Sequence, residues 1–139
     1  MKTILSFFLL AFSLNLFAAG KIKIENPKIR LTPPNTPMTA IFMNMTNHTD
    51  KDVKLVDVKG DFAGKFELHN MEMTNGKMVM RKVESIEVKQ HETTELKSGG
   101  LHIMVFKLKN PLKEGAVHKI SLIFDNKTTV AVDAKVEKM

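Results

Sequence analysis

Two histidines and two methionines stand at a spacing that would let four side chains hold one metal ion. In chain order they are His69, Met80, His102 and Met104, separated by ten, twenty-one and one residues. Imidazole nitrogens and thioether sulfurs make a soft, neutral donor set. Thioethers select Cu(I), whereas Zn²⁺ prefers imidazole with thiolate or carboxylate, and Ca²⁺ or Mg²⁺ requires oxygen. The four residues therefore predict a Cu(I) site.

The Asn75-Gly76 pair predicts a hairpin that would place two of these ligands. Asn-Gly between two β-like runs is a strong cue for a two-residue type I′ turn, in which both central residues have positive φ. In that register Met71 faces Met80 across the hairpin. Because side chains alternate across a strand, His69 and Met80 then share a face as diagonal neighbours, about 7–8 Å apart. A metal ion could bridge them.

The second pair of ligands lies on one expected strand. His102 and Met104 are two residues apart, so they point to the same face of an extended segment. Leu101, Ile103 and Val105 alternate with them and point to the opposite face, where they would supply an aliphatic core stripe. The imidazole and the thioether are therefore expected on the face that does not build the core.

The rest of the chain consists of short β-like runs separated by turn residues, without a convincing amphipathic helix. Strands are expected over residues 21–25, 39–45, 53–58, 66–73, 78–83, 101–108, 117–124 and 128–136. This spacing predicts an all-β sandwich or Greek-key barrel. No linker or long repeat follows residue 20, so residues 20–139 are expected to form a single copper-binding domain.

Residues 1–19 are typical of a Sec signal peptide. Lys2 supplies the positive charge, an apolar run begins at Ile4, and small residues at Ala18, Ala19 and Gly20 predict cleavage within 18–20. The run is too short for a spanning helix and no second one follows. The mature protein is therefore expected to be exported, without an integral membrane segment.

Composition removes several classes of function. The 139 residues contain no cysteine, which excludes disulfides, thiolate ligands, a blue-copper centre and a lipid-modified cysteine within them. The formal net charge is +6, yet no basic run is interleaved with aromatic side chains, so nucleic acid is not an expected partner. No nucleophile elbow, HExxH motif, phosphate loop or plausible carboxylate pair is present, so an enzyme is not expected.

The sequence resembles the periplasmic PCu(A)C-type copper chaperones, whose pattern is H(M)-x10-M-x21-H-x-M. Every required position matches, while Asn70 replaces the optional methionine that follows the first histidine. Flanking segments also match: Glu67-Leu68-His69, Gly99-Gly100-Leu101 and Lys109-Asn110-Pro111-Leu112. The resemblance extends from about Ile29 to Val136. It implies a cupredoxin-like Greek-key β-sandwich and delivery of copper toward cytochrome c oxidase, often alongside Sco-type proteins.

The resulting hypothesis is a monomeric periplasmic Cu(I) metallochaperone that passes copper to an acceptor, such as the copper subunit of cytochrome c oxidase or a Sco-type protein. A periplasmic copper buffer that serves resistance would use the same ligands. A non-metal Ig-like interaction module is the alternative from another class. The roles of Met71, Met73 and Met78 stay open between packing beside the site and receiving or releasing copper. The other histidines, His48, His91 and His118, are expected to face solvent.

Overall fold

The computed structural model describes residues 21–139, and the expected signal peptide lies outside these residues. Their regular structure is all β-strand: β1 (Ile22–Arg30), β2 (Thr39–Asn47), β3 (Val53–Gly60), β4 (Ala63–Thr74), β5 (Lys77–Val83), β6 (Ile86–Val88), β7 (Thr93–Leu96), β8 (His102–Leu108), β9 (Val117–Phe124) and β10 (Thr129–Glu137). The all-β prediction is confirmed. This part of the chain has no helix long and apolar enough to cross a membrane.

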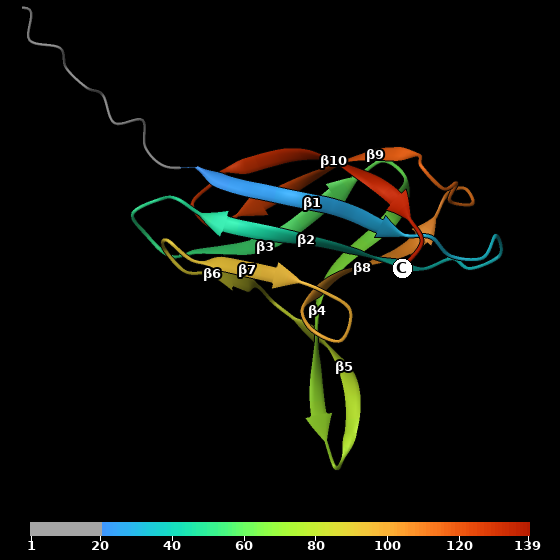
Figure 1. The fold of residues 1–139 in the computed structure, drawn as a ribbon, viewed down its shortest axis with the longest axis horizontal. Helices are drawn as coiled ribbons and strands as arrows, with labels where there is room; N and C mark the ends of the chain where they lie inside the picture. The colour runs from blue at the N-terminus through green and yellow to red at the C-terminus, as the bar shows by residue number, and fades with distance from the viewer. Residues whose placement is uncertain (1–20) are drawn as a thin grey trace, which may run out of the picture.

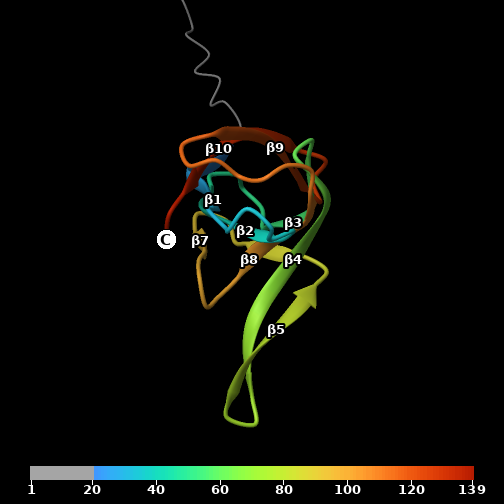
Figure 2. The same ribbon diagram turned by 90° about the vertical axis from the view of Figure 1, so that its right-hand side faces the viewer.

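The strands form one continuously hydrogen-bonded sheet in the order β5-β4-β8-β2-β1-β10-β9-β3-β6, with β7 paired to β2. The sheet folds over on itself into two layers, which Figure 2 shows nearly end-on. The aliphatic core lies between the layers and includes Ile41 and Ile103 from one side and Leu122 and Val136 from the other. This is the cupredoxin-like β-sandwich that the resemblance implies.

Three features of the strands differ from the sequence-based expectation. Strands β6 and β7 were not predicted, because each is only three or four residues long and β7 is mostly polar. Strand β1 continues to Arg30 rather than ending at Glu25. A bulge between Glu25 and Lys28 absorbs Pro27, which has no N–H to donate, and Asn26 adopts a φ of 51° there.

Strand β8 shows the alternation that its sequence predicts. Ile103 and Val105 are fully buried in the core. His102 and Met104 lie on the other face of the sheet. The aliphatic stripe therefore anchors β8 and fixes the direction in which its imidazole and thioether point.

The β4–β5 hairpin follows the predicted register. Asn75 and Gly76 have φ angles of 51° and 77°, as a type I′ turn requires, and Met71 is paired with Met80. Beyond its contact with β8, the hairpin leaves the body of the sandwich as a two-stranded ribbon (Figure 1). The turn thus sets the side-chain pairing of a segment that has little else to define it.

Replacing Gly76 with Ala tests how much the turn controls the hairpin. No atom lies within 4 Å of the position that a Cβ would occupy, so the cost is that of the left-handed backbone alone. That backbone strain should destabilise the hairpin by about 1 kcal/mol. Hydrogen exchange of the β4–β5 amides should therefore become about fivefold faster. Gly115→Ala is the matched control, because Gly115 has a φ of 81° and open space outside the hairpin. Unchanged exchange in the Gly76 variant would contradict this role of the turn.

Candidate metal centre

Strand β4 brings the two halves of the candidate site together because it pairs with β5 on one edge and with β8 on the other. His69 lies directly opposite His102 on β8, and Met71 lies opposite Met80 on β5. Directly paired residues share a face of the sheet. The two imidazole rings are 5.7 Å apart between their centroids. Residues 33 positions apart in the chain thus become neighbours.

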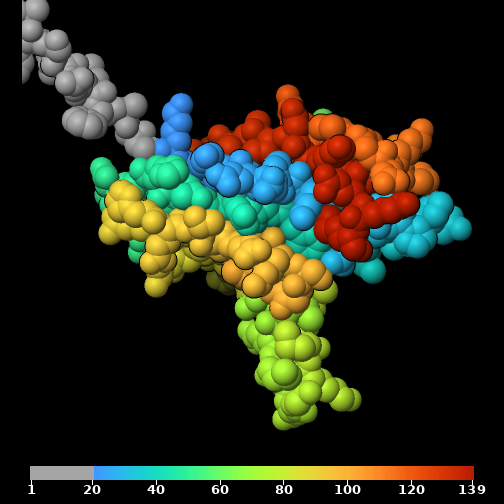
Figure 3. All heavy atoms as spheres, in the orientation of Figure 1, coloured from blue at the N-terminus to red at the C-terminus, as the bar shows by residue number. Residues whose placement is uncertain are grey.

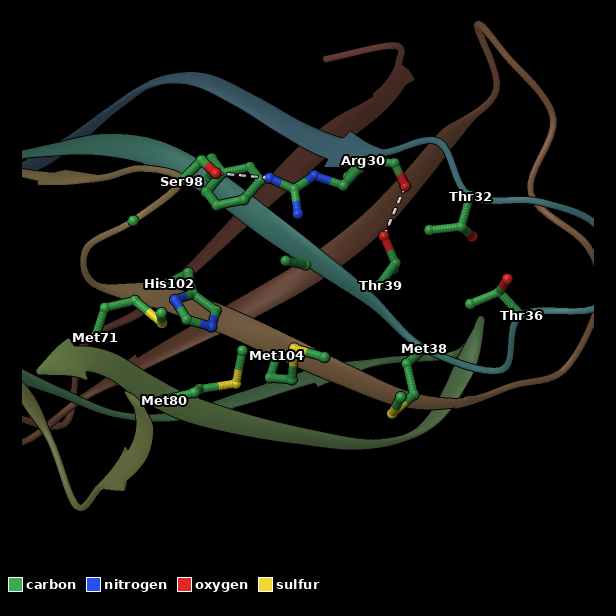
Figure 4. Close-up of a pocket in the computed structure, with 13 residues that line it drawn as sticks. Arg30, Thr32, Thr36, Met38, Thr39, Met71, Met80, Ser98, His102 and Met104 are labelled. Atoms are coloured by element: carbon green, nitrogen blue, oxygen red, sulfur yellow. Dashed lines mark hydrogen bonds between the residues drawn. The ribbon is translucent and has the colours of Figure 1, made fainter. Parts of the chain in front are cut away.

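A pocket of about 320 Å³ opens on this face. Figure 4 shows Met80, His102 and Met104 together at its wall, with Met71 beside them and Met38 farther along. Three of the four predicted ligands therefore line one cavity. His69 is not among its lining residues; its ring lies next to that of His102, and the residue is 8% exposed.

A hydrogen bond determines which ring nitrogen of His102 can bind a metal ion. Its Nδ1 lies 2.8 Å from the carbonyl oxygen of Gly100, and a carbonyl can only accept, so Nδ1–H is the donor. In the neutral ring the lone pair is then on Nε2. Burial lowers the pKa of His102 below its usual 6.5, an effect that the Gly100 bond opposes and that the neighbouring His69 and Arg30 reinforce. His102 is therefore held in the neutral form that binds metals.

Glu67 likewise determines which ring nitrogen of His69 carries the proton. The Nε2–H of His69 donates to Oε2 of Glu67 at 2.7 Å, which leaves the lone pair on Nδ1. Among the buried side-chain nitrogen and oxygen atoms of residues 21–139, Nδ1 of His69 is the one without a hydrogen-bond partner. Buried polar atoms are nearly always satisfied, so an unpartnered nitrogen beside a pocket of soft donors fits the role of a metal ligand.

The Glu67 carboxylate is itself held by cations. Lys65 Nζ lies 2.9 Å from Oε1, and Lys82 Nζ lies 3.7 Å from the same oxygen. The hydrogen bond from His69, followed by that from Lys65, lowers the pKa of Glu67 from 4.5 to about 2. A histidine that gives one N–H to a carboxylate is the usual arrangement behind a metal ligand, because it fixes the tautomer and the ring orientation.

Several residues around the pocket have no role that could be predicted from the sequence. Glu67 appeared only as part of a matching segment. The Phe42 ring lies 6.4 Å from the His102 ring between centroids, and the Arg30 guanidinium sits 5.0 Å above Phe42 while donating to Ser98 Oγ. No spacing rule connects these residues, because they come from β1, β2 and the loop before β8.

The remaining histidines lie away from the pocket. His48 and His91 are exposed, as expected. His118 is half-buried, because its ring stacks on Phe62 at a centroid distance of 4.6 Å. His118 is therefore less exposed to solvent than expected.

The chain is similar to one known protein family and to several solved structures. A family described as lipoprotein LpqE-like matches residues 22–136. The chain belongs to the LpqE-like family. The copper-bound PCuAC domain from PmoF2 is 23% identical with a TM-score of 0.74, and the match covers 88% of this chain and 97% of that domain. At this identity the likeness concerns the fold.

A solved structure with greater sequence identity is CuI-DR1885 from Deinococcus radiodurans. It is 31% identical to the LpqE-like chain with a TM-score of 0.67, over 83% of this chain and 76% of that one. These relatives confirm the resemblance to the PCu(A)C-type family. Protein RP573 of Rickettsia prowazekii (strain Madrid E) is 28% identical over 99 residues. That match covers 70% of this chain and 55% of RP573, so the chain spans about half of that relative's length.

Proposed function

We propose that this protein is a periplasmic metallochaperone that binds one Cu(I) through His69 Nδ1, Met80 Sδ, His102 Nε2 and Met104 Sδ. The observation that carries the proposal is the convergence of soft donors on one face of the sheet. Met80, His102 and Met104 line one pocket, and the orphaned Nδ1 of His69 lies on the neighbouring ring. One of the similar solved structures is the Cu(I) form of DR1885, which supports Cu(I) as the ion here.

The donor set favours Cu(I) over other ions. All four donors are neutral, and a d¹⁰ ion accepts the geometry that a sheet surface imposes without demanding another. The side chain of Met80 is 44% exposed, and the pocket opens on the surface of the molecule. An incoming ligand from a partner can therefore replace one thioether at a time. Such stepwise exchange suits delivery better than storage, which favours the chaperone over the copper-buffer alternative.

The proposal extends to the whole chain. Residues 1–19 would be a signal peptide cleaved within 18–20, and residues 20–139 would form the exported copper-binding domain, acting as a monomer. The name of the family is consistent with an extracytoplasmic protein. The acceptor would be a copper protein such as the copper subunit of cytochrome c oxidase or a Sco-type protein.

Anaerobic titration of the mature protein with Cu(I), against a chromophoric chelator that competes for the ion, tests this function. One tight equivalent is expected, with much weaker binding of Zn²⁺ because the site offers no thiolate or carboxylate ligand. Mixing the loaded protein with an apo acceptor domain should then transfer copper. Failure to compete for Cu(I) would overturn the function, whereas tight binding without transfer would favour the buffer.

A further inference from the structure

The β4–β5 hairpin carries exposed methionines beyond the predicted ligands. Met73 is 68% exposed and Met78 is 50% exposed, near the tip of the ribbon. Figures 1 and 2, two views at right angles, both show the tip well away from the sandwich, and Figure 3 shows it as a narrow projection. These side chains therefore build no core. Their exposure needs another explanation, because large apolar side chains gain stability only by burial.

The four hairpin methionines form two directly opposed pairs. Met73 faces Met78, and Met71 faces Met80. The residues flanking a two-residue turn exchange hydrogen bonds, so both methionine pairs occupy the alternate positions, where strands approach to about 4.5 Å between Cα atoms and side chains lie closest. The two pairs follow each other at about 7 Å, the length of two strand residues. A ladder of thioethers thus leads from the tip to the pocket.

The opposite face of the hairpin has a different character. Glu72 forms an ion pair with Arg81 at 3.0 Å there, and Thr74 and Lys77 lie on the same side. The outer part of the hairpin therefore has its methionines on one face and mostly charged and polar side chains on the other, where Val79 is the apolar exception. Each apolar side chain on the thioether face is a methionine, although Val and Ile have higher strand propensity. A surface selected only to be apolar would not require sulfur at every position.

We propose that Met73 and Met78 form a second, weaker site for a soft monovalent metal ion, which captures Cu(I) and passes it through Met71 and Met80 to the four-ligand site. This inference rests on the proposed function. Along the hairpin each transfer replaces one Cu–S bond with another. At the four-ligand site the bond to Met71 gives way to bonds to Met104 and the two histidine nitrogens, while Met80 stays bound and the ion stays Cu(I) throughout. The tip site is weaker because it offers two donors rather than four, in full contact with water. Weak capture is what a transfer route needs, since a tight first site would retain the ion.

The experiment uses the mature protein with ¹³C-labelled methionine methyl groups and Ag(I), a redox-inert soft monovalent probe. The first equivalent should shift the methyl signals of Met80 and Met104. Further Ag(I) should shift those of Met73 and Met78 in a second, weaker step. In the double variant Met73→Leu/Met78→Leu, the second step should be lost while the first is kept. Met139→Leu, which removes an exposed methionine far from the hairpin, should keep both steps.

The outcomes separate the two proposals. If Met80 and Met104 shift but Met73 and Met78 do not, the tip site is overturned and the four-ligand site stands. If the tip methyls shift but Met80 and Met104 do not, the proposed function fails and the tip site stands. If Met139 shifts together with Met73 and Met78, binding is non-specific and the tip site is overturned. Leucine keeps the face apolar, so full retention of the second step in the double variant would also overturn it.

Discussion

The double variant Met80→Ala/His102→Ala is expected to lose essentially all tight Cu(I) binding. It removes one ligand from the hairpin and one from β8, and it leaves one imidazole and one thioether that do not share the pocket lining. Loss of a supporting residue behind a metal ligand typically costs 10–100-fold in affinity, so loss of two ligands should cost at least about 10⁴-fold. The anaerobic chelator competition measures this directly.

A matched control removes the same two residue types elsewhere. His48→Ala/Met139→Ala deletes an exposed histidine and an exposed methionine outside the site, and should bind Cu(I) as the wild type does. Because His102 is buried, thermal unfolding of the apo double variant should be followed in parallel. A folded Met80→Ala/His102→Ala protein whose affinity stays within about threefold of the wild type would refute the assignment of the ligands.

Glu67→Gln is expected to weaken Cu(I) binding about 10–100-fold without removing a ligand. The substitution preserves shape but takes away the charge that holds the Nε2–H of His69 and the ammonium of Lys65. His69 should then populate both tautomers, and only one of them presents Nδ1 to the metal. The ¹⁵N shifts of the His69 imidazole report that change, which a loss of stability alone would not produce.

Glu72→Gln is the control for this variant. Glu72 lies on the same strand but on the opposite face, where its partner is Arg81. Neither the tautomer of His69 nor the Cu(I) affinity should change. If Glu67→Gln and Glu72→Gln behave alike, Glu67 has no special role in positioning the ligand.

The acid stability of the apo protein gives Glu67→Gln a second readout. The folded protein holds the pKa of Glu67 at about 2, against 4.5 when unperturbed. A lowered carboxyl pKa contributes stability that is present above pH 4.5 and is lost as the pH falls from 4.5 toward 2. The wild type should therefore lose more stability over this range than Glu67→Gln, as measured by denaturant midpoints at each pH.

Local sequence was enough to predict the hairpin and the alternation on β8. The type I′ turn needs two residues that tolerate positive φ, and Asn75-Gly76 supplies both within two positions. Once the turn is set, the pairing of Met71 with Met80 follows residue by residue. On β8, the period of two and the aliphatic stripe decide which face receives His102 and Met104. The hairpin register and the alternation on β8 each depend on a few adjacent residues, so both can be predicted from the local sequence.

Pairing between strands distant in the sequence decided how the two halves of the site meet. That His69 lies opposite His102 depends on β4 joining β8, and no rule of spacing states which strand edges meet. The same holds for the short strands β6 and β7, which exist only because longer strands offer them free edges. Side chains that approach from distant segments, such as Arg30 and Phe42, become visible only once the sheet has folded.

The sequence thus determined the chemical identity of the candidate ligands, and also the local geometry of each half of the site. The tertiary structure decided which nitrogen of each histidine is free, that His69 lies beside the pocket rather than in its wall, and that the methionine hairpin projects into solvent. The physical reason is that donor type and strand period are properties of single residues and their neighbours. Burial, tautomer and exposure instead depend on which distant groups fold against them, such as Glu67 against His69.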